Sequence, residues 1–375
     1  MKQTRIQFFL LLFIFLFLKS FSQEEKLYVG TFTSEGAEGI YLCQFNASTG
    51  EVKLKKTFKA LDNPSFLKVS PDRKKLIVVN RFPPEVEPSG GYVSAYSIES
   101  DGTLQFINKQ ISHGAGPCHV DVSPDSKWVA IATYGGGTTS LYPLNEKGTL
   151  LPATSTIAFE GSGPNTSRQK QPHAHSVKFS PFNQQVFCAD LGTDKLHIFE
   201  LKQNEMNFAG QSFVKTEPGA GPRHFAFHPQ NKIIYIINEL NSTITAIEKK
   251  NQEWKKFQEI STLPANYTSE NYCADIHVSP DGRFLYGSNR GHNSIAVFSI
   301  DPDSNHLFFI KTVPAEGEWP RNFTLSPDGN HLLVANQHTG NITVFKINPE
   351  TGIPDYTGNY LNLPAPVCLE FLPAN

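Results

Sequence analysis

The chain has 375 residues and a formal net charge of −2 at pH 7, with 33 basic and 35 acidic side chains. A protein that binds nucleic acid normally carries a basic excess or a basic stripe, and this sequence has neither, so we expect no nucleic-acid partner. The length is sufficient for one large or two ordinary domains with a substantial core.

The first residues, MKQTRIQFFLLLFIFLFLKSFSQEEK, have the pattern of a secretory signal peptide. Lys2 and Arg5 precede an apolar run at positions 8–18, and small residues follow at the expected cleavage site. The run is too short to span a bilayer comfortably. We therefore expect residues 1–22 to be removed, leaving an exported protein, periplasmic or secreted, with no stable membrane anchor. A retained signal-anchor is the alternative.

A turn signature recurs along the rest of the chain at intervals of 47 to 57 residues. It reads SPD, SPF or HPQ, and its first residues are Ser70, Ser123, Ser180, His228, Ser279 and Ser326. Alternating apolar residues precede each signature, as in a strand with one buried face, and a second apolar run ends ten residues after its first residue. A third strand and a fourth strand with a less regular apolar pattern follow. Each unit is therefore predicted to be a four-stranded antiparallel meander, the blade of a β-propeller.

The two ends of the chain supply the pieces of one more blade. PVCLEFLPAN at the C-terminus has the pattern of a first strand with nothing after it. KLYVGTFT and GIYLCQFN near the mature N-terminus are a second and a third strand with nothing before them. We therefore predict an all-β fold, a seven-bladed β-propeller in which N- and C-terminal strands share one blade and close the ring.

The polar residues gather at one mouth of the predicted channel. The first strand of a blade lies nearest the axis and the second runs back beside it, so the start of the first and the end of the second share one face of the disc. These rim places hold Ser65, Phe66, Arg81, Cys118, His119, Tyr134, His175, Ser176, Leu191, Arg223, His224, Glu239, Ala274, Asp275, Arg290, Arg321, Asn322, Gln337, Val367 and Cys368. Titratable and cationic groups in such number favour an active site or an anion-binding pocket. The alternative is a mouth that is polar only because it is wet.

Some local patterns admit a structural explanation. His173 and His175 face alike on an extended strand, which could suit a metal, but further ligands would have to converge at about 2 Å. Asp275 and His277 flank Ile276 in a first strand, and either could simply satisfy buried backbone groups. The five cysteines are widely spaced and include no C-x-x-C pair, so buried free thiols are expected rather than disulfides or a metal site.

Several segments resemble one known family: PHAHSV, DLGTDK, GPRHFAFHP, NEL followed by ST, ADIHVSPDGRFLYGSNRGH and PRNFTLSPDG. From about Lys26 to Phe371 the chain resembles the seven-bladed propeller lactonases. That family groups bacterial 6-phosphogluconolactonases of the propeller type with fungal carboxymuconate lactonising enzymes. The resemblance implies a single propeller domain over residues 26–375 that forms or hydrolyses a lactone with no required metal or cofactor.

The family's proposed site, carried over motif by motif, consists of a His, an Arg, a Glu and a second Arg around the channel mouth. These fall on His175 in PHAHS, Arg223 in GPRH, Glu239 in NEL and Arg290 in NRG. All four belong to the part of the propeller that the repeat assigns to the mouth. Around them we expect substrate contacts from His119, Tyr134, His173, His224, Arg321 and Gln337.

Lactone opening needs an attacking water, relief of charge on the carbonyl oxygen and a proton for the leaving alkoxide. Glu239 or His175 could be the general base or acid, and Arg223 and Arg290 could hold an anionic group and stabilise the oxyanion. A carboxylate between two arginines should have a lowered pKa, so His175 is slightly favoured as the proton carrier.

Three functions stay open at this point. The first is a lactonase acting on a small-molecule lactone that carries a carboxylate or another anionic group. The second is a lactonising cycloisomerase of the carboxymuconate type, and the third is a non-catalytic propeller that binds a partner. The signal peptide favours an unphosphorylated sugar lactone, or another lactone found outside the cytoplasm, over a phosphorylated one made inside.

Overall fold

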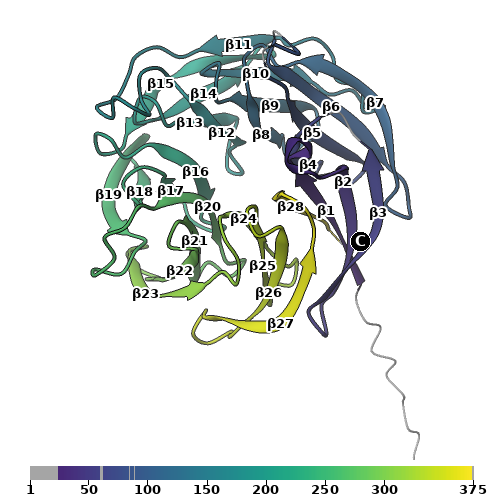
Figure 1. Ribbon diagram of the computed structural model, residues 1–375. Helices are drawn as coiled ribbons and strands as arrows, with labels where there is room; N and C mark the ends of the chain where they lie inside the picture. Colours follow the sequence, from purple (N-terminus) through teal and green to yellow (C-terminus); the bar gives the residue numbers. More distant parts are fainter. Residues whose placement is uncertain (1–23, 60–61, 84, 88, 374–375) are drawn as a thin grey trace, which may run out of the picture.

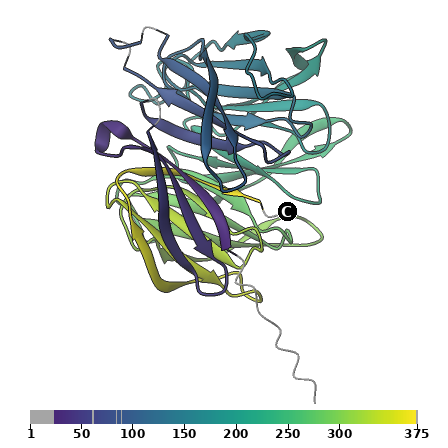
Figure 2. The same cartoon turned by 90° about the vertical axis from the view of Figure 1, so that its right-hand side faces the viewer.

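The computed structural model describes residues 24–59, 62–83, 85–87 and 89–373, and the expected signal peptide lies outside them. The described chain forms seven sheets of four strands each, set like blades around a central axis (Figure 1). Within these ranges the only helix is one 3₁₀ turn, η1 (Thr33–Glu35), which projects from one face of the disc (Figure 2). No helix of this part of the chain is long and apolar enough to span a membrane. The predicted seven-bladed all-β propeller is confirmed.

Every blade is antiparallel, and its strands follow one another from the axis outward. Blades 1 to 3 consist of β4 (Pro64–Val69), β5 (Lys75–Arg81), β6 (Gly91–Ile98), β7 (Leu104–Ile111); β8 (Pro117–Val122), β9 (Trp128–Thr133), β10 (Thr138–Pro143), β11 (Ser155–Ala158); and β12 (Ala174–Phe179), β13 (Gln185–Asp190), β14 (Lys195–Lys202), β15 (Glu205–Lys215). Blades 4 to 6 consist of β16 (Pro222–Phe227), β17 (Ile233–Asn238), β18 (Thr243–Lys250), β19 (Glu253–Ser261); β20 (Tyr272–Val278), β21 (Phe284–Arg290), β22 (Ser294–Ile300), β23 (Leu307–Pro314); and β24 (Pro320–Leu325), β25 (His331–Asn336), β26 (Asn341–Ile347), β27 (Pro354–Asn362). Blade 7 consists of β28 (Pro366–Leu372), β1 (Glu24–Thr31), β2 (Gly39–Asn46) and β3 (Glu51–Lys59).

The ring closes through blade 7, as the sequence predicts. The C-terminal strand β28 pairs with the N-terminal strand β1, with Leu369 opposite Val29. On its other side β28 meets blade 1, where Glu370 accepts a hydrogen bond from the backbone N–H of Val69 at 3.1 Å and an ion pair from Lys68 at 2.9 Å. These contacts join the two ends of the described chain, so the channel has a continuous wall.

The hydrophobic core lies between the blades. Strand β17 is buried along its whole length, because a neighbouring blade covers each of its faces. Ile234 and Ile236 pack toward Phe187 of blade 3, while Tyr235 and Ile237 pack toward blade 5. Full burial of a large apolar side chain contributes about 1.5–3 kcal/mol, so these layers hold the blades, and the rim residues at their ends, in fixed positions.

Each innermost strand carries a bulge at the same place. In six blades one residue is left without a partner in the ladder: Ser65, Cys118, His175, Arg223, Arg321 and Val367. In blade 5, Ala274 and Asp275 together face Ser288. A bulge turns a side chain out of the regular alternation of a strand. In the six blades with one unpaired residue, that residue lines the channel mouth, and in the blades with a turn signature it lies five positions before the signature.

Candidate active site

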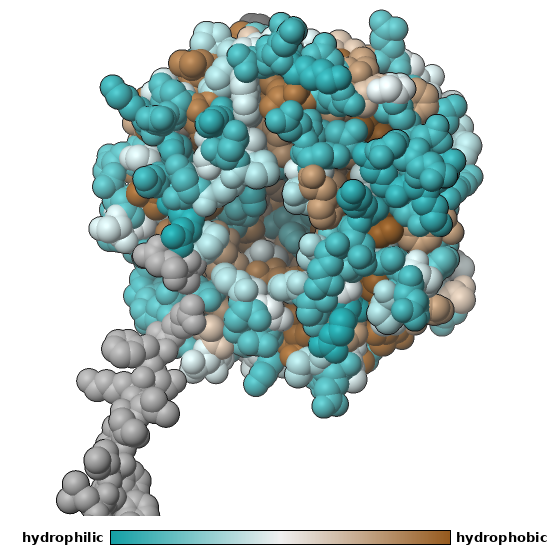
Figure 3. Space-filling model, turned by 180° about the vertical axis from the view of Figure 1, so that it is seen from behind, coloured by the Kyte–Doolittle hydropathy of each residue, from teal (hydrophilic) through white to brown (hydrophobic). Residues whose placement is uncertain are grey.

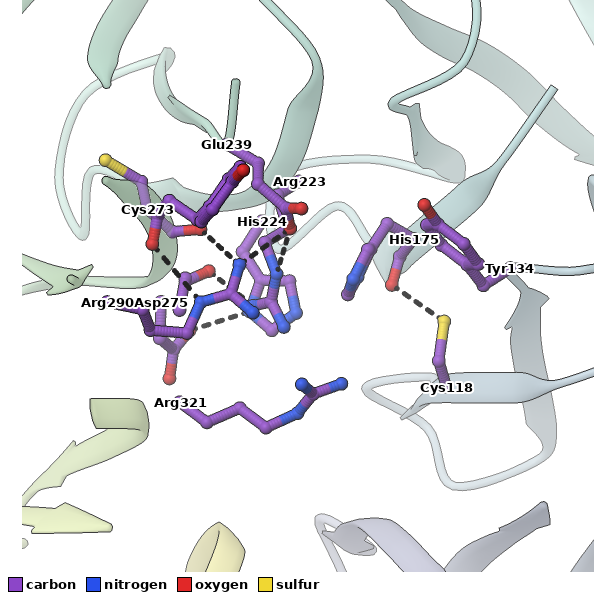
Figure 4. A network of polar contacts seen from close by, with 12 residues as sticks. Cys118, Tyr134, His175, Arg223, His224, Glu239, Cys273, Asp275, Arg290 and Arg321 are labelled. Atoms are coloured by element: carbon purple, nitrogen blue, oxygen red, sulfur yellow. Dashed lines mark hydrogen bonds and ion pairs between the residues drawn. The ribbon is translucent and has the colours of Figure 1, made fainter. Parts of the chain in front are cut away.

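Two arginines from different blades share one carboxylate at the channel mouth. Glu239 follows the end of β17, and its Oε2 lies 3.0 Å from Nε of Arg223 and 2.8 Å from Nη2 of Arg290 (Figure 4). All three side chains are buried. The sequence predicted that these residues share the mouth, and the structure brings them into direct contact.

A third arginine, which the sequence analysis missed, completes this cluster. Arg168 comes from the loop between β11 and β12, and its Nη2 lies 2.5 Å from Oε1 of Glu239 and 3.3 Å from the hydroxyl of Tyr134. Comparison of the repeats could not find it, because the loop has no counterpart in the other blades. Its one visible signal was a basic residue shortly before the PHAHS segment.

Backbone carbonyl groups of β20 hold two of the arginines in place. Arg223 donates from Nη1 to the carbonyl of Ala274 at 2.5 Å. Arg290 donates to the carbonyls of Tyr272 and Cys273 at 3.2 and 3.0 Å. With these bonds formed, the guanidinium groups need little reorganisation to receive a negative charge, which is the property required of an oxyanion-stabilising site.

The cluster carries an excess of positive charge. Burial acts to raise the pKa of Glu239, but Arg290, Arg223 and Arg168 outweigh it and lower that pKa to about 2, so the carboxylate stays ionised. Burial, together with Arg290, lowers the pKa of Arg223 to about 10, which leaves it cationic at neutral pH. Three cations therefore meet one anion at Glu239, and the cluster attracts a further negative charge.

Three histidines lie beside the arginines. The ring centroids of His175 and His224 are 5.4 Å apart, and those of His119 and His224 are 5.2 Å apart. All three are buried, and burial is the main cause that lowers their pKa values, to about 4 for His224 and well below the usual range for His119 and His175. They are thus neutral at neutral pH. Nδ1 of His175 is buried and has no hydrogen-bond partner, so this atom is free for a bound molecule.

The arginines and histidines surround a small pocket in the channel mouth. Its lining comes from six blades and the segment before η1: Phe32, Ser65, Phe66, Arg81, Cys118, His175, Arg223, His224, Arg321, Asn322 and Val367. Figure 4 shows the tip of Arg321 extending into the space between the Arg223 cluster and His175. The pocket therefore presents cations, neutral histidines and an aromatic wall to the same small volume.

The opposite face of the disc is also hollowed at its centre (Figure 3). A wider hollow lies between the turns of blades 2 and 3, beside Asp125, Trp128 and Gln184. Asp125 is the one charged residue in its lining, so this hollow offers no converging groups for chemistry. We take the smaller pocket at the mouth as the candidate site, because the charged groups converge there.

The remaining residues predicted to contact substrate lie at or near this pocket. Tyr134 stacks on His173 with centroids 4.3 Å apart and meets His175 edge-on at 5.5 Å. Arg321 lies over the ring of Phe32 and 3.5 Å from Oε1 of Gln337. The amide group of Gln337 is bonded in turn to Glu35 of η1, so it positions Arg321.

One expectation about the cysteines is wrong. Cys43, Cys188, Cys273 and Cys368 are buried free thiols as predicted, but Cys118 is partly exposed and lines the pocket. The reason is the bulge in β8, which turns Cys118 toward the channel, where its thiol lies 3.3 Å from the carbonyl oxygen of His175.

Fold and site together define a seven-bladed propeller with a cationic pocket for a small molecule at one mouth. The family model described as "Lactonase, 7-bladed beta-propeller" matches residues 26–371, and the chain belongs to this family. The expected family membership, and with it the prediction of a lactonase, is confirmed.

Individual relatives agree with this assignment. The chain is 37% identical to a 6-phosphogluconolactonase of Bacillus subtilis over 349 residues, which cover 92% of this chain and 97% of that protein. A putative 6-phosphogluconolactonase from Bacteroides fragilis has a similar crystal structure, with a TM-score of 0.87, 34% identity and coverage of 94% and 99% of the two chains. A periplasmic gluconolactonase of Pseudomonas aeruginosa gives a TM-score of 0.86 at 30% identity, over 94% and 100% of the chains.

Proposed function

We propose that this protein is a hydrolase that opens the ring of a lactone outside the cytoplasm. The observation that carries the proposal is a carboxylate bound by three arginines beside buried, neutral histidines. Hydrolysis of an intramolecular ester needs a base for the attacking water, positive charge at the carbonyl oxygen and a proton for the leaving alkoxide. The arginines supply the charge, and a histidine moves the proton.

The roles of the four predicted catalytic residues follow from their contacts. Arg223 and Arg290 are held by backbone carbonyls with further donors available, so they stabilise the oxyanion and then the product carboxylate. Glu239 is a weak base, because its pKa is lowered to about 2, and it serves to hold the arginines together. The proton carrier is therefore a neutral histidine of the pocket and not Glu239.

The substrate class that fits best is an unphosphorylated sugar lactone, or a related lactone, that carries a carboxylate or another anionic group. The excess of arginine over carboxylate in the pocket supports the anionic group. The N-terminal pattern of the sequence supports export, and so does the likeness to a periplasmic gluconolactonase. N-terminal sequencing of the protein recovered from its native compartment is expected to begin at Gln23, whereas a chain that still begins at Met1 would contradict cleavage of the signal peptide.

Acid release tests the proposed activity. The purified mature chain is mixed with a panel of sugar and aliphatic lactones, phosphorylated and unphosphorylated, in a buffered pH indicator. We expect hydrolysis of at least one sugar lactone, which Arg223→Ala abolishes in a folded protein. Conversion of an unsaturated dicarboxylate without uptake of water would point to a cycloisomerase instead. Binding of lactones without turnover would point to a non-catalytic propeller.

A further inference from the structure

We propose that His224, held by Asp275, is the group that carries the proton during lactone hydrolysis, and that Asp275 is its positioning residue. The inference depends on the lactonase function proposed above and assigns the base within it. It also reassigns to His224 the role that the sequence slightly favoured for His175.

The first observation is the set of bonds around the Asp275 carboxylate. Its Oδ1 lies 2.8 Å from Nδ1 of His224, and its Oδ2 lies 3.1 Å from Nε2 of His277 and 2.5 Å from the side-chain amide of Asn322. Asp275 is buried, and although burial acts to raise its pKa, His277 and His224 hold that pKa well below the usual range. An ionised carboxylate only accepts hydrogen bonds. His224 must therefore carry its proton on Nδ1, which leaves Nε2 as a bare acceptor.

The second observation is how the backbone aims this pair. Asp275 lies in the bulge of β20, where its N–H donates to Oγ of Ser288 at 2.9 Å instead of to the ladder. The side chain is thereby directed across the blade boundary to His224 on β16. Asp275 also accepts from the backbone N–H groups of Ile276 at 2.9 Å and of Phe323 at 3.4 Å, which is the structural role that the sequence left open. Satisfying these N–H groups does not require a histidine at position 224, so the contact with His224 needs its own explanation.

The third observation is the contrast between two histidines of the same pocket. His175 faces Arg223, His224, Arg321 and Arg290, and burial and all four of these groups oppose its protonation. No carboxylate is bonded to His175 among the described residues. An imidazolium at His175 would therefore be buried among cations without a counter-ion, which is a strongly unfavourable state.

His224 has similar cationic neighbours but also a counter-ion. It faces Arg223 on its own strand, His175 and Lys178 on β12, His119 on β8, Asp275 on β20 and Phe66 on β4. Asp275 is bonded in turn to His277 and to Asn322 on β24. Burial and Arg223 lower its pKa to about 4, so it is a neutral base in the free enzyme, while Asp275 acts to raise that pKa. Once His224 has taken a proton, it forms an ion pair with Asp275 at 2.8 Å. A base oriented and stabilised by a third group is the arrangement that recurs in hydrolases.

The reaction then balances within the pocket. Nε2 of His224 takes a proton from water as the water oxygen bonds to the lactone carbonyl carbon, and the carbonyl electrons move to the oxygen held by Arg223 and Arg290. When the tetrahedral intermediate collapses, the ring C–O bond breaks and Nε2–H of His224 protonates the leaving alkoxide. The new carboxylic acid loses its proton to solvent. The unpartnered Nδ1 of His175 is placed to bind the water or a substrate hydroxyl.

Three variants test the assignment on the most active lactone. Removal of a general base lowers the rate by about 10²–10⁴-fold, so we expect His224→Ala and Asp275→Asn each to lower kcat by at least about 100-fold with KM changed less than about threefold. Free imidazole should restore part of the kcat of His224→Ala, because the cavity left by the side chain can hold the same base. The matched control is His331→Gln, which replaces another buried histidine, one whose ring packs against Phe45 of blade 7, and should change kcat by less than about threefold.

Each outcome decides between the two proposals. A wild-type protein inactive on every lactone contradicts the lactonase function itself. An active wild type whose His224→Ala variant keeps kcat within threefold overturns the present inference, even if Asp275→Asn fails to fold. So does a loss in His331→Gln as large as that in Asp275→Asn, or a loss in His224→Ala that imidazole leaves unchanged, since merely structural residues would behave in these ways.

Discussion

Arg168 and Glu239 are 71 positions apart in the chain, yet Nη2 of the arginine lies 2.5 Å from Oε1 of the glutamate. The contact joins the loop between blades 2 and 3 to the residue that follows the second strand of blade 4. It gives Glu239 a third guanidinium partner on the carboxylate oxygen that Arg223 and Arg290 do not use.

Arg168→Ala is expected to weaken catalysis without unfolding the propeller, because two arginines remain on Glu239. A hydrogen bond to a charged group contributes about 1.5–3 kcal/mol, so kcat/KM should fall about 10- to 100-fold. The control is Arg283→Ala on the opposite face, where Arg283 pairs with Asp281 at 2.7 Å and should leave kcat/KM unchanged. Equal kcat/KM values in the two variants would show that Arg168 has no part in the site.

Arg168 also shows where prediction from the sequence stops. The blades could be predicted because the turn signature and the strand alternation are local and repeated. His175 and Arg223 could be placed at the mouth because equivalent positions in a repeat occupy equivalent places in space. A loop present in one blade has no equivalent, so only the folded chain shows that Arg168 reaches Glu239.

The role of Asp275 illustrates a second limit. From the sequence, this residue could satisfy backbone groups or act in the site. The decision depends on the bulge at Ala274 and Asp275, which directs the carboxylate to His224 of the neighbouring blade. The same kind of bulge places Cys118 in the pocket, although its apolar surroundings in the sequence predicted a buried thiol. The repeat places these residues at the rim, but a register irregularity of one residue is not visible in a hydrophobic pattern, and it decides the direction in which each side chain points.

Arg321 is expected to govern affinity for anionic substrates. Burial, with Arg223 and Arg290, lowers its pKa to about 9, and the group stays cationic at neutral pH. Arg321 contacts the oxygen of Gln337 at 3.5 Å and the face of Phe32, and neither group carries a charge, so the guanidinium has a positive charge to offer to a ligand. Arg321→Ala should raise KM for a lactone with a carboxylate group about 10-fold with little change in kcat.

Steady-state kinetics with two substrates test this expectation. A neutral lactone of similar size should show less than about a twofold change in KM, since a lost ion pair affects only the charged substrate. Arg321→Lys should recover part of the affinity because it keeps the charge. An equal rise in KM for both substrates would mean that Arg321 shapes the pocket but does not bind the anionic group.

The ion pairs of Glu239 should make stability depend on pH in the acid range. Its pKa is about 2 in the folded protein, against about 4.3 for an unfolded glutamate. The unfolded state therefore binds more protons between these values, so this stabilisation is complete above about pH 4.3 and disappears as the pH falls toward 2. Glu239→Gln should accordingly flatten the fall in unfolding free energy between about pH 4.5 and 2.

Urea denaturation at several pH values measures how steeply the unfolding free energy falls with decreasing pH. Glu51→Gln is the control, because Glu51 is exposed and pairs only with the exposed Lys53. The Glu51 variant should show the same fall in unfolding free energy with decreasing pH as the wild type. Asp275 and Asp190 also have lowered pKa values, so part of this fall should remain in every variant. Identical slopes for the two glutamate variants would contradict a carboxylate held ionised by the arginines.

An added methyl group at Gly30 of β1 should destabilise the contact between blades 7 and 1 that closes the ring. A Cβ there would lie 2.6 Å from the backbone oxygen of Pro64 and 3.2 Å from Cys368, where blade 7 meets blade 1. Because a backbone atom must move, Gly30→Ala should lower the free energy of unfolding by about 1–3 kcal/mol. Gly210→Ala in β15 is the matched control, since nothing lies within 4 Å of its added Cβ, and its effect should stay within about 0.5 kcal/mol. Equal urea midpoints for the two variants would mean that the seam between the first and last strands is loosely packed, and that other contacts, such as that of Glu370 with Lys68, hold the ring closed.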